Sequence, residues 1–155
     1  MVAALAADTD VILLDSPAAL GSKSAVLPVV LADRIIVVLQ PTVPSLSDGL
    51  KIQEYALAYG TGVAGILFNR VADDEDIEGV ATKAERYFEG ETLASIPESD
   101  EVRAARRAGR PLLAHAPASA AARRYREAAS ALTVADIDSG DVADRFRSAV
   151  IPEEQ

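Results

Sequence analysis

The chain has 155 residues, half of them apolar, no cysteine and a formal net charge of −9. This length and composition predict one globular domain, and they exclude disulfides and cysteine-based metal centres. No apolar run reaches the roughly 18 residues that a transmembrane helix needs, and no basic flank precedes the apolar N-terminus, which disfavours a signal peptide. We therefore expect a cytoplasmic protein without a membrane helix.

The acidity of the chain indicates its environment more than its partners. Only three of the 15 basic residues are lysines, against 24 acidic residues. A composition rich in acids and alanine and poor in lysine is typical of a high-salt cytoplasm, where salt screens the repulsion between like charges. We therefore expect a halophilic source, and the acidity argues against a general nucleic-acid surface.

Four apolar runs predict strands that are buried on both faces, as in a parallel sheet. The first run is residues 11–14, which leads into Asp15 and is stopped by Pro17. The other three runs are residues 34–40, 63–70 and 92–96. Ligands of such sheets bind beyond the carboxyl ends of the strands, which predicts a functional position for Asp15. The alternative is that Asp15 only caps a local turn.

Helical patterns separate these strands. The apolar spacing predicts helices over residues 22–32, 45–59, 77–88, 100–108 and 119–132. Ser45 offers an N-cap for the second of them, and Gly60 and Gly90 follow the second and the third. Alternating strands and helices predict an α/β fold, with a mostly parallel sheet of at least four strands and helices on both faces.

Five stretches of the chain carry a family resemblance when they are taken in order. They are DVILLDSPA, RIIVVLQPT, GILFNRV, ASIPESDEV and GRPLLAHAPASAAARRYREAA. Together they resemble the second half of the MinD/ParA-type, deviant-Walker P-loop ATPases, and the DSPA and IPES pieces are closer to the MinD branch. The resemblance implies a partial P-loop domain over residues 1–132. The acidic, weakly patterned residues 133–155 predict a tail, in which Val142, Phe146 and Val150 fit one short helix.

The resemblance also implies roles for individual residues in binding ATP and Mg²⁺. Asp15 matches the Walker B aspartate, which holds Mg²⁺ through a water molecule. Asn69, with Arg70 beside it, matches the base-binding asparagine, whose amide offers both a donor and an acceptor to an adenine edge. The loop along the base and ribose is matched by Pro97 and Glu98, and the turn beside the phosphates by Pro41 and Thr42. Structural alternatives remain open, since Asn69 could cap a strand and Pro97 could end one.

The chain departs from the family pattern at the phosphate loop. It contains no G-x-x-x-x-G-K-[ST], and Gly21-Ser22-Lys23-Ser24 lacks the upstream glycine and the Gly-Lys pair, which predicts a surface turn there. Without such a loop, tight ATP binding and hydrolysis by this chain alone are not expected. The family places the phosphate-loop strand between the strands ending at Asp15 and Gln40. Its absence predicts that these strands close up, that another chain fills the gap, or that the chain is a fragment.

Charge is unevenly distributed along the second half of the chain. Residues 73–101 hold eleven acids and two bases, whereas residues 103–126 hold seven arginines and no acid. The arginines fit either a nucleic-acid patch or a solvated helix face that pairs with the acidic helix, and the second interpretation is favoured because aromatic residues are sparse among them. The acidic tail argues against membrane binding, and His115, the only histidine, predicts no metal site.

Two functional hypotheses follow. The first is a MinD/ParA-like ATPase-domain protein that positions the division site, a chromosome or a plasmid by an ATP-dependent dimer switch. It would act as a homodimer or with a related ATPase chain, and with a division or partition protein as a further partner. The second is a non-catalytic, nucleotide-free binding or scaffold module that pairs with a full-length relative.

Overall fold

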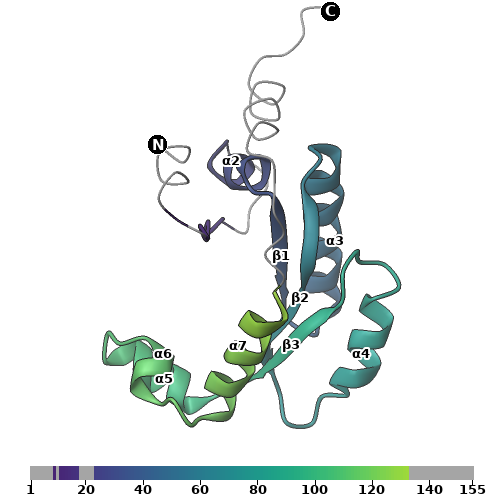
Figure 1. The fold of residues 1–155 in the computed structure, drawn as a ribbon. Helices are drawn as coiled ribbons and strands as arrows, with labels where there is room; N and C mark the ends of the chain where they lie inside the picture. Colours follow the sequence, from purple (N-terminus) through teal and green to yellow (C-terminus); the bar gives the residue numbers. More distant parts are fainter. Residues whose placement is uncertain (1–8, 10, 18–22, 133–155) are drawn as a thin grey trace, which may run out of the picture.

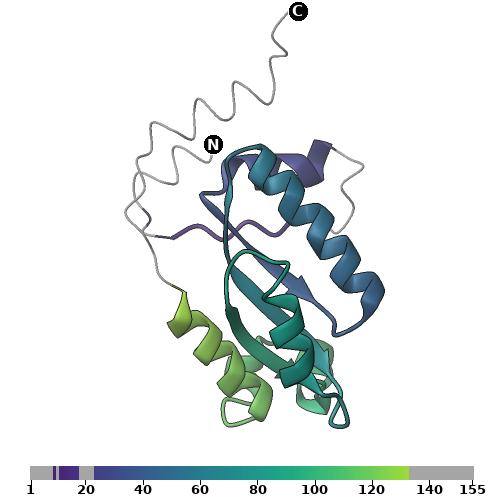
Figure 2. The ribbon, with the colours of Figure 1, turned by 90° about the vertical axis from the view of Figure 1, so that its right-hand side faces the viewer.

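The computed structural model describes residues 9, 11–17 and 23–132. Its elements in chain order are α2 (Lys23–Leu31), β1 (Arg34–Leu39), α3 (Val43–Ala58), β2 (Gly62–Val71), α4 (Ile77–Ala84), β3 (Thr92–Pro97), α5 (Asp100–Arg107), α6 (Leu112–His115) and α7 (Ala120–Ala131). Figures 1 and 2 show the sheet between α3 and α4 on one face and α7 on the other. The predicted α/β fold with helices on both faces is confirmed.

The sheet is parallel and has the order β1-β2-β3. Strand β1 pairs with β2 from Arg34↔Gly62 to Leu39↔Phe68, and β2 pairs with β3. Three of the four predicted strands therefore form, within about two residues of the expected bounds. Because all three run in one direction, their carboxyl ends share one edge of the sheet.

The strand predicted over residues 11–14 is not formed. Residues 11–17 carry no helix or strand, and the side chains of Val11 and Leu13 are 52% and 81% exposed. A strand needs a hydrogen-bonded neighbour, and among the described residues β1 pairs with β2 alone. The expectation that Asp15 ends a strand of this sheet is therefore wrong for the described part of the chain.

The larger core lies between the sheet and the α3–α4 layer. Leu39, Ile66 and Phe68 from the strands are at most 3% exposed and pack with Phe88, which follows α4. Gly49 lets α3 approach closely, since a Cβ atom there would lie 2.5 Å from Leu39 Cδ2. Burial of these side chains is the main term that holds α3 on the sheet.

The smaller core lies on the opposite face, between β3 and α7. Ala94 and Ile96 of β3 pack against Ala121 and Ala128 of α7. The small side chains let the helix lie close to the strand, and the Ser119 hydroxyl caps α7 by accepting from the Ala122 N–H at 3.2 Å. The predicted helix over residues 119–132 is confirmed.

Two buried polar side chains tie the elements together. Gln53 of α3 donates to the Tyr87 carbonyl at 3.0 Å and accepts from the Glu89 N–H at 2.6 Å. Thr61, before β2, donates to the Val29 carbonyl of α2 at 2.8 Å. Each side chain is at most 5% exposed, and these bonds supply the partners that burial requires.

The predicted helix caps are partly corrected. Helix α3 begins at Val43 with Thr42 as its N-cap, because Pro44 fits the first helical turn, and the Ser45 hydroxyl instead accepts from the Gln40 N–H at 2.9 Å. Of the surface turn predicted at residues 21–24, Lys23 and Ser24 instead begin α2. Residues 21–22 lie outside the described residues. So does the tail from 133, with its expected helix at Val142, Phe146 and Val150. No helix in the described ranges is long and apolar enough to cross a membrane.

Candidate functional site

The carboxyl edge of the sheet brings together six of the seven residues expected at the site. Pro41 and Thr42 follow β1, and Asn69 and Arg70 lie near the end of β2. Pro97 is the last residue of β3, and Glu98 follows it. Leu39 is level with Phe68, and Val71 is level with Pro97. The Glu98 N–H donates to the Val71 carbonyl at 2.8 Å, and this bond joins the end of β2 directly to the segment after β3.

A bulge in β2 shapes the centre of this edge. Phe68 faces Ser95 and Val71 faces Pro97, so three steps along β2 match two along β3. Arg70 has a φ of 58°, the left-handed region that side chains rarely adopt, and its N–H donates to the Asn69 side-chain oxygen at 3.0 Å. Bulges redirect side chains, and left-handed non-glycine residues are concentrated at functional sites.

Glu98 links the end of β3 to two arginines. Its Oε1 lies 3.6 Å from Arg70 Nη2 and 3.6 Å from Arg103 Nη1. All three side chains are between 42% and 61% exposed, so these pairs contribute little to stability. Their effect is to hold a carboxylate and two guanidinium groups close together at the carboxyl edge of the sheet.

The turn after β1 is tight. The Thr42 N–H donates to the Gln40 carbonyl at 2.8 Å, and the Thr42 carbonyl accepts from Leu46 N–H at 3.0 Å in the first turn of α3. The Thr42 side chain is exposed and makes no capping hydrogen bond. Its hydroxyl and the N-terminus of α3 are therefore accessible to a ligand at this edge.

Asp15 is the predicted site residue for which the described residues show no contact with this edge. It is exposed, and within the described residues no hydrogen bond or ion pair joins it to Asn69, Arg70 or Glu98. The described ranges also contain no group of three or more His, Cys, Asp or Glu side chains that could hold a metal. A magnesium ion here would depend on one carboxylate, water and phosphate oxygens.

Arg103 is the site residue that sequence reasoning missed. It was expected only as part of a basic stretch, yet it pairs with Glu98 and with Asp100 at 2.8 Å. The sequence feature that could have predicted this role is the position of Arg103, one helical turn after the loop that contains Glu98. A side chain on the first turn of α5 returns toward that loop.

The arginines of residues 103–126 do not pair with the acidic helix in the way expected. The described ion pairs are local, such as Arg124–Glu127 at 2.8 Å, and none of those recorded joins these arginines to α4. Arg123 and Arg126 donate to the carbonyls of Ala118 and Pro117, both at 2.7 Å. The loop before α7 therefore uses two of these arginines for its own hydrogen bonds.

The three parallel strands, their flanking helices and the polar carboxyl edge define a protein of the MinD-type P-loop ATPase fold. The structure is similar to the cell division ATPase MinD of Pyrococcus furiosus, with a TM-score of 0.74 and 25% identity over 84% of this chain and 54% of that one. It is also similar to the septum site-determining protein MinD of Pyrococcus horikoshii OT3 complexed with Mg-ADP, with a TM-score of 0.69 and 26% identity over 83% of this chain and 52% of that one.

Sequence comparison agrees with the fold. The chain is 34% identical over 123 residues to an uncharacterized ATP-binding protein of Methanocaldococcus jannaschii, covering 79% of this chain and 46% of the relative. Residues 3–142 match the family model of 4Fe-4S iron sulfur cluster binding proteins, NifH/frxC family, and the chain belongs to this family. It spans about half the length of the relatives named above.

An iron–sulfur cluster does not fit this chain. Such clusters are held by cysteine thiolates, and none of the 155 residues is a cysteine. The single histidine, His115, lies exposed on α6. The chain therefore has the fold of its family without the ligands for the cluster in the family's description.

Proposed function

We propose that the chain is a cytoplasmic MinD-like ATPase-domain protein that binds the base of ATP and takes part in spatial positioning, of the division site or of a chromosome or plasmid. The carboxyl edge is the observation that carries the proposal. It places a β2 bulge with Asn69 and Arg70 beside the Pro97–Glu98 loop. The similarity to MinD proteins, one of them complexed with Mg-ADP, supports a nucleotide as the ligand.

In this proposal different residues of the edge bind different parts of the nucleotide. The Asn69 amide reads the adenine edge, with its oxygen already oriented by the Arg70 N–H at 3.0 Å. Pro97 and Glu98 lie along the base and ribose, and Pro41 and Thr42 lie beside the phosphates. Bound Mg²⁺ would neutralise phosphate charge, with Asp15 holding it through water. Asp15 would then have to move to the edge.

Calorimetric titration of the full chain with Mg-ADP and Mg-ATP at about 2 M KCl tests the proposal, since this salt screens the repulsion within an acidic chain. We expect adenine nucleotides to bind about tenfold more tightly than guanine nucleotides, because an amide that pairs with adenine leaves groups unpaired on guanine. Asn69→Ala should abolish this preference. Equal binding of both bases by the unaltered chain would contradict the assignment of Asn69.

The role of Asp15 needs a separate comparison. Asp15→Ala should weaken Mg-ATP binding about tenfold and leave binding of magnesium-free ATP unchanged, because the carboxylate acts only on the metal. Asp74→Ala is the matched control, since it removes an exposed carboxylate from the loop after β2. If both variants bind Mg-ATP equally well, Asp15 has no role in holding magnesium.

A second candidate function is favoured by the N-terminal segment. Val11 and Leu13 are exposed apolar residues in a run without strand pairing, and the sequence has no phosphate loop. These features fit a nucleotide-free module. Such a module would use this apolar run to pair with a full-length relative that has a phosphate loop. The pairing would bury the exposed apolar side chains.

Size-exclusion chromatography with the Methanocaldococcus jannaschii ATP-binding relative distinguishes the two functions. Co-elution that is lost in Leu13→Asp, together with no heat from either nucleotide, would establish the module. Independent elution together with adenine-specific binding by the chain alone would establish the nucleotide-binding function. The matched control is Leu57→Asp, because Leu57 is also an exposed leucine but lies on α3.

A further inference from the structure

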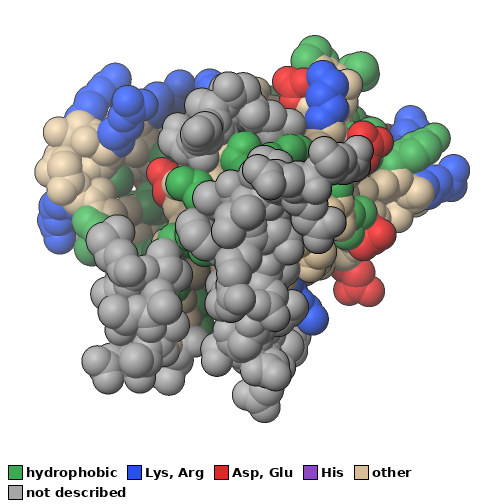
Figure 3. All heavy atoms as spheres, turned by 90° about the horizontal axis from the view of Figure 1, so that it is seen from above, with side chains coloured by type: hydrophobic (Ala, Val, Ile, Leu, Met, Phe, Trp, Pro, Cys, Tyr) green, Lys and Arg blue, Asp and Glu red, His purple; other side chains and the backbone are tan. Residues whose placement is uncertain are grey.

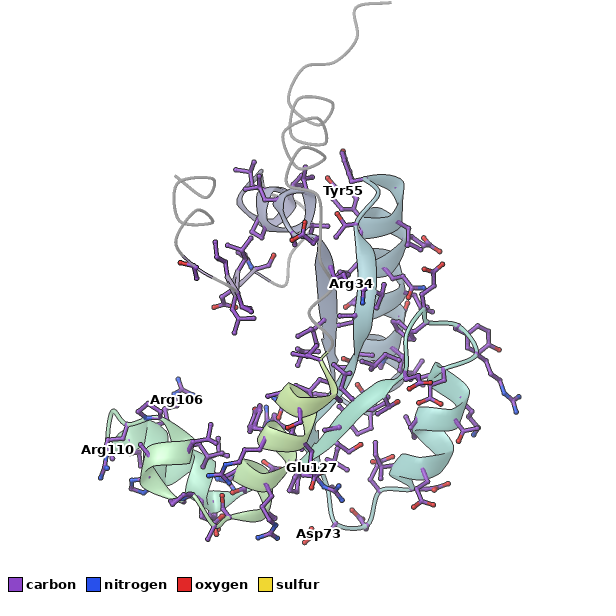
Figure 4. The ribbon with its side chains drawn as sticks, in the orientation of Figure 1. Arg34, Tyr55, Asp73, Arg106, Arg110 and Glu127 are labelled. Carbon is purple, nitrogen blue, oxygen red and sulfur yellow. The ribbon has the colours of Figure 1, made fainter. Side chains whose placement is uncertain are left out.

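Helix α5 and the short α6 form a unit at the margin of the molecule, after the carboxyl end of β3 (Figure 1). Ala105 is the one buried residue of α5, and α6 has none. Figure 3 shows Lys and Arg side chains along the outer rim of this unit, and Figure 4 shows Arg106 and Arg110 directed outward from it. The unit therefore presents side chains to the surroundings more than it packs on the core.

Three arginines of α5 share one hollow. Arg103, Arg106 and Arg107 line a surface depression of about 380 Å³, and we call these three residues the arginine face. Their spacing of three and four residues places them on one side of the helix. Side chains of like charge so close together repel one another unless anions lie between them.

Intramolecular contacts neutralise one of the three. Arg103 pairs with Asp100 at 2.8 Å and approaches Glu98 at 3.6 Å. For Arg106 and Arg107 no ion pair or hydrogen bond of the side chain is recorded among the described residues, although their place in the last turn of α5 suits the helix dipole. Two guanidinium groups therefore remain available to an external anion.

The surroundings of the face indicate the kind of partner. Val102 of α5 and Leu113 of α6 are 36% and 44% exposed, so apolar side chains lie on the same unit as the arginines. Residues 100–115 contain no Phe, Trp or Tyr on which a nucleobase could stack, and the chain as a whole carries a charge of −9. Carboxylates next to apolar side chains complement this surface better than a nucleic acid does.

We propose that the arginine face is a docking surface for an acidic, amphipathic segment of a partner protein. The partner's carboxylates enter the hollow and bind Arg106 and Arg107 in the bidentate geometry that guanidinium groups allow. The partner's apolar side chains cover Val102 and Leu113. This surface lies beside the carboxyl edge, since Arg103 belongs to the arginine face and also pairs with Glu98 at 3.6 Å.

Fluorescence anisotropy of the full chain with a labelled peptide tests the proposal. The probe is a helical peptide of about 16 residues with glutamates on one side and leucines on the other, and a second peptide carries glutamine in place of glutamate. We expect the acidic peptide to bind at least about tenfold more tightly than the glutamine peptide, a difference that shrinks as salt is raised. Equal binding of both peptides would overturn the proposal.

Charge reversal locates the binding surface. The double variant R106E/R107E should weaken acidic-peptide binding about tenfold or more. The matched control K83E/R86E reverses two exposed cations on and just after α4 and should change binding less than about twofold. Circular dichroism confirms folding, and R106Q/R107Q, which removes the charges without reversing them, should also weaken binding. An equal loss in the control variant would overturn the proposal.

The remaining outcomes concern other occupants of the face. Tighter binding of a duplex DNA than of the acidic peptide would assign the surface to nucleic acid. Dimers that the charge reversal disrupts would assign it to a second copy of the chain. A chain ending at Leu132 that binds the acidic peptide about tenfold more tightly than the full chain would assign it to the chain's own acidic residues 133–155. Each of these results overturns the proposal of an external acidic partner.

Discussion

Arg70 shows how one residue can combine strain with function. A left-handed backbone at a non-glycine residue is unfavourable, by roughly 1 kcal/mol, and Arg70 adopts it at the bulge in β2. In return, the Arg70 N–H orients the Asn69 amide, and the Arg70 side chain reaches toward Glu98. The position therefore gives up some stability to aim two polar side chains at the carboxyl edge.

A pair of substitutions at Arg70 separates the backbone from the side chain. Arg70→Gly and Arg70→Ala both remove the ion pair with Glu98, but only glycine relieves the left-handed backbone at φ 58°. We expect the glycine variant to be about 1 kcal/mol more stable toward urea than the alanine variant. Equal free energies of unfolding would show that this backbone conformation carries no strain.

The residues of this site were predicted from a pattern of sequence motifs, and not from the geometry of the sheet. Asn69 and Glu98 were predicted because ordered motifs resemble a family, and the structure brings them to one edge. The bulge and the positive φ of Arg70 were not predicted, because an arginine gives no local signal for a left-handed backbone. Asp15 was placed on a strand by its apolar run, but strand formation also depends on a neighbouring strand, which no local pattern reveals.

At the scale of elements, a hydrogen bond joins Glu85, the C-cap of α4, to Thr92 at the start of β3. The Thr92 N–H donates to Glu85 Oε1 at 3.0 Å. The hydroxyl of Thr92 and then its backbone N–H lower the pKa of the Glu85 carboxyl below the usual 4.5, because both stabilise the charged form. Of these two groups, the N–H makes the recorded hydrogen bond.

This contact predicts a pH dependence of stability. A carboxyl whose pKa is lower in the folded state stabilises the fold above its unfolded pKa, and the contribution is lost as the pH falls through the folded value. Glu85→Gln should therefore lower the melting temperature at neutral pH, by about 1 to 3 °C for such an exposed contact. The difference from the unaltered chain should shrink as the pH falls below 4.5 and vanish once the pH is below the lowered folded pKa of Glu85.

Thermal unfolding followed by circular dichroism at several pH values measures this effect. The control is Glu54→Gln on α3, which removes one exposed carboxylate and has no hydrogen bond recorded among the described residues. It should leave the melting temperature almost unchanged at every pH. A pH-independent deficit in Glu85→Gln would attribute the loss to packing and not to ionisation.

The elements themselves differed in how well local patterns specified them. Strands β1, β2 and β3 were predicted within two residues because buried parallel strands are continuous apolar runs. Helix α3 was predicted to begin at Ser45, but it begins at Val43, because proline in the first turn favours an earlier start than the nearest serine suggests. The hydrogen-bond partners of Gln53 lie 34 and 36 residues away, so the sequence around Gln53 could not predict these bonds.

At the scale of the whole molecule, charge is separated between two regions. The arginine face lies on α5, whereas Asp73, Asp74 and Glu75 occupy the loop between β2 and α4 and are all exposed. Figure 4 shows Asp73 on this loop. With a net charge of −9, repulsion between such carboxylates opposes folding at low salt, when the Debye length is about 10 Å.

This distribution predicts that salt stabilises the chain. Raising KCl from about 0.1 M to about 1 M shortens the Debye length to about 3 Å and should raise the melting temperature. Neutralising the loop in the triple variant D73N/D74N/E75Q should raise the melting temperature at low salt and reduce its rise with salt, because fewer charges remain to be screened. Asp76 is left unchanged, since its carboxylate caps α4 by accepting from the Gly79 N–H at 3.1 Å.

The comparison of salts separates screening from a general strengthening of apolar burial. Screening depends on ionic strength and is nearly complete by about 0.5 M, whereas excluded salts such as sulfate continue to stabilise as their concentration rises. If the triple variant keeps the full salt dependence of the unaltered chain, repulsion in the loop after β2 does not limit stability. If instead its curve is flat in KCl and still rises in sulfate, the acidic loop accounts for the response to ionic strength, and burial of the two cores accounts for the rest.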